Sequence, residues 1–405
     1  MRQSEHRSGL PKVEKIHLPE KHMALRVVLL TAAIVVAAVS LVYGLTGLLN
    51  QQPGWQKIEA ATKETSYSQE FTLGYDLGVQ GVSATAEKKA LTDLFSRSME
   101  KAYAIFDTES QASGGLRWLS DHPNTKVSVD PALYQALETL KKAESRYLYL
   151  APAYVEQNRI FGADSPETAA GYDPSWDPEL KAYLQRCAEF AQDPAMIDLE
   201  LLEDGQVLLK VSQAYLDFAE ENEISCLLDL GWMRNAFICD WIAEQMTSQG
   251  FTLGIIASAD GFTRNLDGRE KDYSLNLFAR DGNLVNVPGA LQYRGPMALV
   301  QLRNYPLSQE DSGRYAVYPD GTVASRYLSL KDGLCHPAME ELLLYDRGST
   351  CAELALASAA LFLEGEGELS GEAVWTEGHQ IRYSDPNAVF VPGVNGDAYT
   401  FRSAK

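Results

Sequence analysis

One uncharged apolar segment near the N-terminus constrains this chain more than any other feature. Residues 27–49 contain no charged side chain, and a helix of that length spans about 34 Å, at about 1.5 Å per residue. The hydrocarbon core of a bilayer is about 30 Å thick, so this helix is long enough to cross it. The alternative is a cleavable signal peptide, whose apolar stretch is usually about 7–15 residues long. We favour an uncleaved transmembrane anchor, because the segment is longer and runs directly into residues 50–53 (NQQP).

The flanking charges predict the orientation of this anchor. Residues 1–26 carry six basic and three acidic side chains, whereas Lys57 and Lys63 are the only basic residues close to the other end. Under the positive-inside rule the large C-terminal part then lies outside the cytoplasm, at the cell membrane. We expect these parts: a cytoplasmic tail (1–26), a transmembrane helix (27–49), a linker (50–69), a folded domain (70–384) and a C-terminal tail (385–405).

The composition argues against one class of partner. The chain has 35 basic and 55 acidic residues, a net charge of −20, and such a surface repels nucleic acid. We therefore expect no nucleic-acid partner. The five cysteines include no Cys-x-x-Cys pair, and their odd number excludes a complete disulfide framework. Most are expected to be small buried apolar side chains, with one bridged pair left open.

Hydrophobic periodicity predicts an α+β domain. Residues 71–79 have the composition of a strand, and residues 206–212 that of an edge strand. Residues 88–107 have the spacing of an amphipathic helix. Two further helices are predicted to begin at Asp130-Pro131 and Asp177-Pro178, with aspartate as the N-cap and proline at the first helical position.

The segment from residue 226 onward is the most distinctive. Residues 226–251 (CLLDLGWMRNAFICDWIAEQMTSQGF) predict a buried strand, a glycine turn and a helix of at least four turns. Residues 251–262 (FTLGIIASADGF) predict another buried strand that ends at a tight turn. A glycine turn at a helix start presents backbone N–H groups to which a phosphate can bind. Alone this is weak evidence, because many such turns hold no ligand.

The motifs at residues 106–110, 228–240 and 312–315 resemble, in this order, those of the FAD:protein FMN transferase (ApbE) family. Residues 228–236 (LDLGWMRNA), with Asp240 further on, are similar to the family's L-D-L-G-G-I-A-K-G-x-x-x-D element. Phe106-Asp107 and Ser110 fall where the family has S-x-F-x-x-x-S-x-x-S, and residues 312–315 (SGRY) resemble its S-G-x-Y strand.

The C-terminal matches continue in the same order. Residues 318–333 resemble the hairpin that follows, with its turn at Pro319-Asp320-Gly321. Residues 352–363 (AELALASAALFL) are similar to the family's A-D-A-L-S-T-A-L-F helix, and residues 374–385 to its closing hairpin. The matches extend over residues 70–384, which we therefore identify as an ApbE-like flavin transferase domain.

The resemblance implies an α+β fold with mixed sheets, and a reaction. The family binds FAD, a magnesium ion polarises the pyrophosphate, FMN is transferred to a threonine or serine of a target protein, and AMP is released. Such chemistry depends on positioning and on cations that neutralise charge. The implied partners are a flavin and a flavoprotein target, and the implied flavin-binding residues are Asp229, Gly231, Arg234, Asp240, Ser312, Gly313 and Tyr315.

Four positions that carry the family's chemistry depart from its pattern. The metal-binding helix of the family carries two oxygen ligands four residues apart, on one helix face; here those positions are Ala355 and Ala359, so no metal ligands are expected. The family lysine aligns with Asn235 and the family histidine with Arg326. A guanidinium cannot act as a general base near neutral pH, so the catalytic residues are not identified.

Arginines can still supply positive charge. Arg326 and Arg234 can hold a phosphate by bidentate contacts, or can be ordinary surface arginines. His336 is the one candidate for a displaced base, although a solvated loop histidine is the simpler interpretation. Trp232, where the family has glycine, either fills the cleft or offers a stacking face to a flavin.

Three hypotheses follow. The first is a membrane-anchored pseudoenzyme that binds flavin or acts as a scaffold after losing its metal and base residues. The second is an active transferase with a rewired site, and the third is a fold reused for an unrelated contact. We favour the first, because the lost metal ligands, histidine and lysine would have to be compensated by residues that the sequence does not identify.

Overall fold

The computed structural model describes most of the chain beyond the apolar segment. The described residues are 52–61, 67–281, 284–307, 311, 313–365, 372–377, 380–383, 389–392 and 399–400. Pro53–Lys405 form one compact unit and Met1–Gln52 another. The predicted tail (1–26) and transmembrane helix (27–49) lie outside the described residues. Within the part that is described, no helix is both long enough and apolar enough to cross a membrane.

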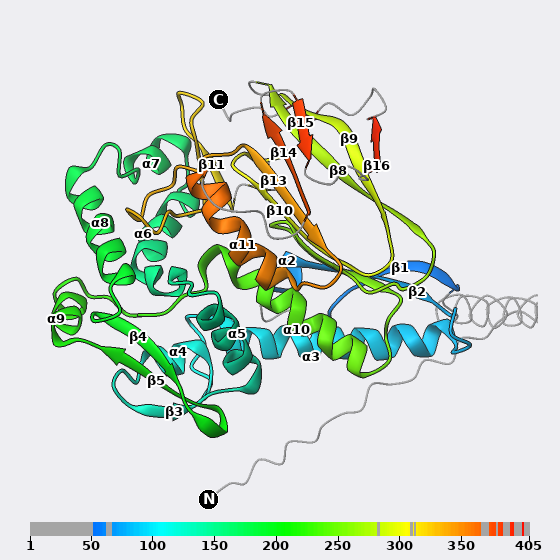
Figure 1. Ribbon diagram of the computed structural model, residues 1–405, viewed down its shortest axis with the longest axis horizontal. Helices are drawn as coiled ribbons and strands as arrows, with labels where there is room; N and C mark the ends of the chain where they lie inside the picture. Colours follow the sequence, from blue (N-terminus) through cyan, green and yellow to red (C-terminus); the bar gives the residue numbers. More distant parts are fainter. Residues whose placement is uncertain are drawn as a thin grey trace, which may run out of the picture. The chain divides into compact units, whose positions relative to one another are not determined.

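An eight-stranded sheet forms the centre of the folded unit (Figure 1). Its strands, in spatial order, are β1 (Gly54–Ile58), β2 (Phe71–Leu77), β6 (Gly254–Ser258), β7 (Phe262–Asn265), β10 (Met297–Arg303), β13 (Glu341–Asp346), β14 (Glu372–Glu377) and β15 (Gln380–Tyr383). All neighbouring strands in it are antiparallel. The predicted mixed sheet is therefore wrong: turns such as the one between β6 and β7 are too short for the crossover that parallel strands need.

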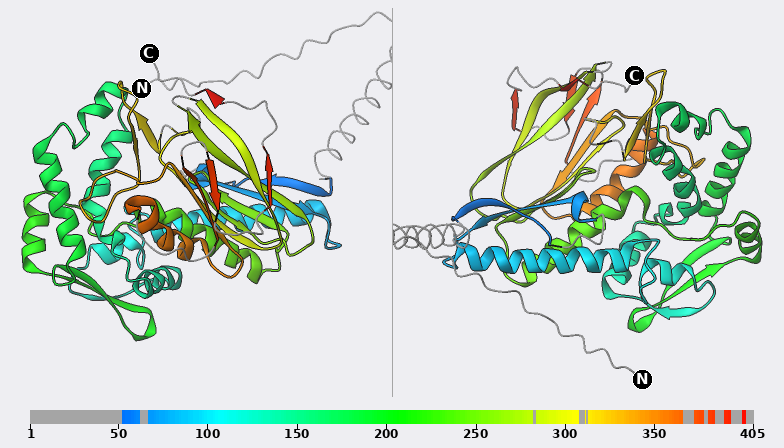
Figure 2. Two further views of the ribbon diagram at one scale, coloured as in Figure 1. Left: turned by 45° about the horizontal axis from the view of Figure 1, so that its top comes forward. Right: turned by 180° about the vertical axis from the view of Figure 1, so that it is seen from behind.

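Three helices pack against one face of this sheet, namely α3 (Ala84–Phe106), α10 (Arg234–Ser248) and α11 (Cys351–Glu364) (Figures 1 and 2). Helix α10 contacts β6 and β7 and also both other helices, while α11 contacts β10 and β13. Helix α11 begins with a capping box, because the Thr350 hydroxyl and the Glu353 carboxylate each accept from the other's backbone N–H.

The opposite face of the sheet is covered by a long β-hairpin. Strands β8 (Asp272–Asp281) and β9 (Leu284–Arg294) pack a small apolar core, which includes Leu277, against β10 and β13. Along β10, Leu299 belongs to this small core and Val300 to the main core, as expected where side chains alternate between faces. Strands β16 (Val389–Pro392) and β17 (Tyr399–Thr400) pair with β9, so the predicted C-terminal tail contributes strands to a sheet.

A second group of elements lies between α3 and α10 in the sequence. It holds α4 (Leu116–Ser120), α5 (Pro131–Lys142), α6 (Ala151–Phe161), α7 (Pro166–Gly171), α8 (Pro178–Gln192), α9 (Gln213–Glu221) and a sheet of β3 (Lys126–Ser128), β5 (Gln206–Val211) and β4 (Ile197–Leu201). Asp130 and Asp177 accept hydrogen bonds from the first turns of α5 and α8, as predicted. Strand β5 is not an edge strand, because β3 and β4 pair with its two sides.

Two further expectations are corrected. Residues 50–69 are not a plain linker, since they include β1 and most of α2 (Tyr67–Glu70). Residues 226–230 form no strand: Leu228 and Leu230 are buried, but no strand among the described residues pairs with this segment. All five cysteines are free, so the bridged pair left open is absent.

Strand β2 and the hairpins of β11 (Tyr315–Val317) with β12 (Val323–Ser325) and of β14 with β15 are confirmed.

Candidate functional site

The glycine turn before α10 is built by packing as well as by sequence. The Asp229 carboxylate accepts a hydrogen bond from the Gly231 N–H at 2.8 Å, and the Asp229 N–H donates to the Leu148 carbonyl at 2.9 Å. Gly231 has φ +55°. A Cβ added there would lie 2.2 Å from Cζ of Tyr154, closer than any real contact. Only glycine fits both this backbone conformation and this approach.

The first two residues of α10 meet a pair of acids. The Arg234 guanidinium lies 3.1 Å from the Glu70 carboxylate and stacks over the Tyr67 ring, 4.6 Å from its centroid. The Asn235 side-chain amide donates to Glu70 at 2.8 Å and to Asp260 at 2.9 Å. Asn235, at the position of the family lysine, therefore bridges two carboxylates.

Burial sets the charge state of these groups. Burial acts to lower the pKa of Arg234, whereas the charges of its neighbours Tyr67 and Glu70 act to raise it. The neighbours outweigh burial, so the pKa is raised and the guanidinium stays charged. Burial, and then the charge of Glu70, raises the pKa of Asp260. One oxygen of Asp260 is buried without a hydrogen-bond partner. Burial likewise raises the pKa of Asp229.

Arg326 lies next to this group of residues. It follows β12, is half-buried, and donates from Nη2 to the Gly313 carbonyl at 2.8 Å. Its Nε is buried without a partner. Burial, and then the charge of Arg234, lowers the pKa of Arg326, and the charge of Arg314 acts in the same direction. Arg326 is therefore partly buried rather than a fully exposed surface arginine.

The three arginines differ in their partners. Arg234 pairs with Glu70, and Arg314 pairs with Asp311. Within the described residues, Arg326 forms no ion pair with a carboxylate. The site thus combines three guanidinium groups with two carboxylates held by Asn235, and the charges of Glu70 and Asp260 act on Arg326 without forming an ion pair with it among the described residues. We refer to Arg234, Arg314 and Arg326 as the arginine cluster.

The fold matches solved structures, although no protein-family model and no curated protein matches the sequence. The ApbE protein of Thermotoga maritima superposes with a TM-score of 0.53 at 12% identity, over 84% of this chain and 97% of that one. The flavin transferase ApbE of Vibrio cholerae superposes with a TM-score of 0.51 at 12% identity, over 82% and 97%. The chain has the ApbE fold.

The structure brings some of the predicted flavin-binding residues together and not others. Arg234 belongs to the arginine cluster, the Gly313 carbonyl accepts from Arg326, and Asp229 with Gly231 forms the turn that leads into Arg234. Ser312 lies outside the described residues. The ApbE resemblance also implies Tyr315 and Asp240 as flavin-binding residues. Both side chains instead form hydrogen bonds elsewhere in the protein. The sequence motifs did not identify Glu70 and Asp260 as site residues. Glu70 belongs to no motif, and Asp260 lies in the tight turn predicted after β6.

Two aromatic residues near the ApbE motifs belong to the core. Tyr315 is buried, and its hydroxyl donates to the Arg303 carbonyl at 3.0 Å. Trp232 is 5% exposed and packs edge-on against Tyr147 and Tyr327, at centroid distances of 6.2 and 5.4 Å. Of the two alternatives for Trp232, filling the interior is therefore confirmed, and a flavin cannot stack on this indole.

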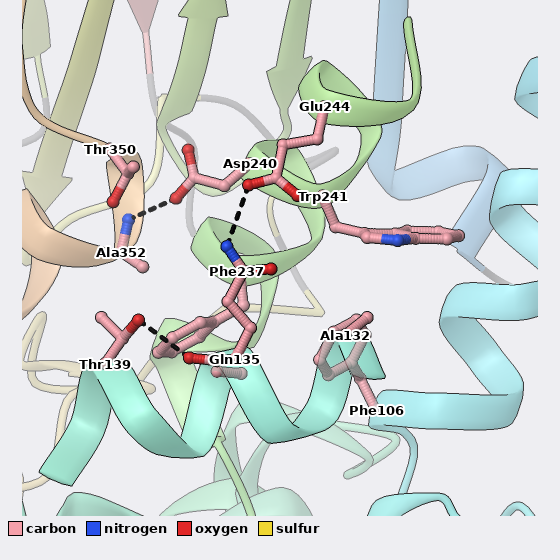
Figure 3. A pocket seen from close by; sticks show the side chains of 11 residues that line it. Phe106, Ala132, Gln135, Thr139, Phe237, Asp240, Trp241, Glu244, Thr350 and Ala352 are labelled. Atoms are coloured by element: carbon pink, nitrogen blue, oxygen red, sulfur yellow. Dashed lines mark hydrogen bonds between the residues drawn. The ribbon is translucent and has the colours of Figure 1, made fainter. Parts of the chain in front are cut away.

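Asp240 joins two helices. Its carboxylate accepts from the N–H group of Ala352 at 2.8 Å (Figure 3). It also accepts from the N–H group of Cys351 and from Arg264, both at 2.9 Å. Burial raises the pKa of Asp240 to about 6. The Asp240 side chain also lines a cavity of about 50 Å³ between α5, α10 and the start of α11. That volume holds a few water molecules and not a flavin.

The residues at the ApbE metal positions do not fit a metal ion. Ala355 is fully buried and Ala359 is 3% exposed, and neither offers a side-chain oxygen. In the described part of the chain, no three His, Cys, Asp or Glu side chains are close enough together to hold a metal ion. His336 bonds with Asp332 of its own loop at 3.0 Å. We therefore derive no reaction step through magnesium.

Proposed function

We propose that this chain is a membrane-anchored protein outside the cytoplasm that binds FAD, or a similar dinucleotide, by its pyrophosphate. The observation that carries the proposal is the half-buried guanidinium of Arg326, which has no carboxylate partner among the described residues and an unpartnered buried Nε. A pyrophosphate would supply the missing negative charge and the missing acceptors. Flavin is the ligand class suggested by the flavin transferase ApbE of Vibrio cholerae, which has the same fold.

The physical reason is the cost of a charge that is removed from water. A buried ionic group without a partner is strongly destabilising, so proteins rarely retain one unless a ligand or another ion completes it. Here Arg234 and Arg314 add further positive charge near Arg326. A planar guanidinium also matches the geometry of phosphate, and can bind it by two parallel hydrogen bonds.

The side chains at the site favour a protein that binds a flavin over one that transfers it. Arg326 stands where the ApbE resemblance expects a histidine, and a guanidinium cannot accept a proton near neutral pH. The positions of the two metal ligands hold buried alanines. The arginine cluster replaces the positive charge of a metal in binding, but it does not provide a base for the attacking hydroxyl.

Titration of the full-length chain in detergent micelles with FAD tests the proposal. Flavin fluorescence reports binding, and the Arg326→Ala variant should lose at least about 1.5 kcal/mol, roughly tenfold in affinity. Arg159→Ala is the matched control, because Arg159 is exposed and pairs only with a nearby glutamate on its own helix. An unchanged affinity of Arg326→Ala would contradict the proposal, and absence of any FAD binding would favour a scaffold.

One observation favours the second candidate, an active transferase. Asp260 has a raised pKa and one unpartnered oxygen, which are properties of a general base. An active enzyme would release AMP from FAD in the presence of a threonine-containing peptide from a flavoprotein target. The Asp260→Asn variant should then abolish AMP release without weakening FAD binding. No release in the unmodified protein would leave the flavin-holding function.

A further inference from the structure

The loop that follows β2 is uncharged and exposes apolar side chains. Residues 77–83 (LGVQGVS) contain no charged side chain in a chain of net charge −20. Val79 and Val82 are 49% and 51% exposed. Single exposed valines are ordinary, but two at one loop tip without a charge between them form a local apolar surface.

This loop lies where the folded unit begins. Strands β1 and β2 are antiparallel, and Gly54 pairs with Leu77, so the loop after Leu77 adjoins the first residues of the unit. Gly78 packs against the ring of Pro53: a Cβ at Gly78 would lie 3.1 Å from Cβ of Pro53. Trp55, two residues beyond Pro53, is also exposed, at 42%.

The covalent chain limits the distance between this loop and an anchor. Four Cα–Cα steps separate Leu49, the last residue of the apolar segment, from Pro53. They span at most about 14 Å, at about 3.6 Å per residue, and the headgroup layer itself occupies about 5–7 Å. This step depends on the anchoring that we propose above. With the anchor in a bilayer, Pro53 and the adjoining loop are held at the lipid headgroups.

The charges around the loop suit a membrane surface. Lys57 and Lys89 are exposed nearby, on β1 and in the second turn of α3. Glu87, in the first turn of α3, is 3% exposed, and its carboxylate accepts from the Gly78 N–H at 2.7 Å. The acid therefore faces inward while the two lysines face solvent, an arrangement that favours anionic lipid headgroups.

We infer that residues 78–83 form a second membrane contact, in which Val79 and Val82 insert at the boundary between headgroups and acyl chains. The occupant is the lipid bilayer and not a second copy of the chain, because the anchor brings the loop to the lipid whatever the protein concentration. Such a contact fixes one end of the main sheet on the membrane surface. It thereby restricts the orientations of the folded unit.

Fluorescence quenching by lipid tests this contact in the full-length protein. A single cysteine is introduced as Val79→Cys or Val82→Cys, labelled with a polarity-sensitive fluorophore, and reconstituted in vesicles whose lipids carry a nitroxide near the headgroup. Val155→Cys, at a position on α6 that is 47% exposed, is the matched control. The unmodified protein measures background from the five native cysteines, four of which are buried. We expect quenching at 79 and 82 to exceed that at 155 by at least about twofold.

The outcomes separate the loop from the anchor. Vesicle flotation of the same samples reports anchoring on its own. A protein that floats, but whose labels at 79 and 82 are quenched no more than the label at 155, overturns the loop contact and leaves the anchor intact. A protein that does not float overturns both. Label self-quenching that grows with the protein-to-lipid ratio would show a contact between copies instead.

Discussion

Replacing Gly231 by alanine should destabilise the folded unit far more than replacing an ordinary left-handed glycine. Gly231 has φ +55°, and a left-handed conformation costs an alanine about 1 kcal/mol. The new Cβ would also lie 2.2 Å from Cζ and 2.6 Å from the hydroxyl of Tyr154, which is 4% exposed and cannot move aside freely. Overpacking of this kind costs about 1–3 kcal/mol. The expected total loss is about 2–4 kcal/mol.

Gly250→Ala separates the two contributions. Gly250 has φ +83°, but no atom lies within 4 Å of its added Cβ, so this variant carries only the backbone cost of about 1 kcal/mol. Denaturant unfolding followed by tryptophan fluorescence measures both variants, and Trp232 lies next to the altered residue. Equal losses in the two variants would refute the steric argument.

A double-mutant cycle identifies Tyr154 as the cause. Tyr154→Ala removes the ring, so Gly231→Ala should cost only about 1 kcal/mol in that background, a coupling of about 1–3 kcal/mol. An additive double variant would show that the tyrosine is not the obstacle. Because Gly231 leads into Arg234, Gly231→Ala should also weaken FAD binding.

Three further predictions concern buried acids and metal. Asp240→Ala should cost about 3–5 kcal/mol in denaturant unfolding and Asp240→Asn less, because alanine leaves two N–H groups of α11 and Arg264 without their acceptor. Burial raises the pKa of Glu341 to about 7, so the folded protein favours the protonated carboxyl. The contribution of Glu341 to the free energy of unfolding is therefore fully present below about pH 4.5 and is lost as the pH rises to 7. Glu341→Gln should flatten that pH dependence by on the order of 2–3 kcal/mol; an unchanged slope would contradict the raised pKa. Millimolar magnesium should leave the melting temperature of the full-length chain unchanged, and an upward shift would indicate a metal site.

The features predicted correctly from the sequence are those whose hydrogen bonds or turns involve residues only a few positions apart. Asp130 with Pro131 starts α5, Asp177 with Pro178 starts α8, and Gly321 forms the hairpin turn between β11 and β12. Each depends on hydrogen bonds or backbone dihedrals that neighbouring residues supply. The sequence therefore determined where many helices and hairpins begin, and the ordered motifs sufficed to predict the ApbE-like fold.

The tertiary structure decided the features that need a distant partner. The apolar residues 226–230 have the composition of a strand, but in the part of the chain that the structure describes no strand pairs with them. Strand β1, in the expected linker, pairs with β2. Trp232 is buried because Tyr147 and Tyr327 pack on it. Composition cannot reveal such partners, since they come from segments far apart in the chain.

The candidate site shows the same division. The motif around Gly231 located the start of α10, but it did not reveal Glu70 and Asp260, which meet Asn235 across separations of 165 and 25 residues. Nor could it show that Arg326 is half-buried beside two other arginines. Charge and burial at a site depend on which segments the fold brings together, and only the folded chain fixes them.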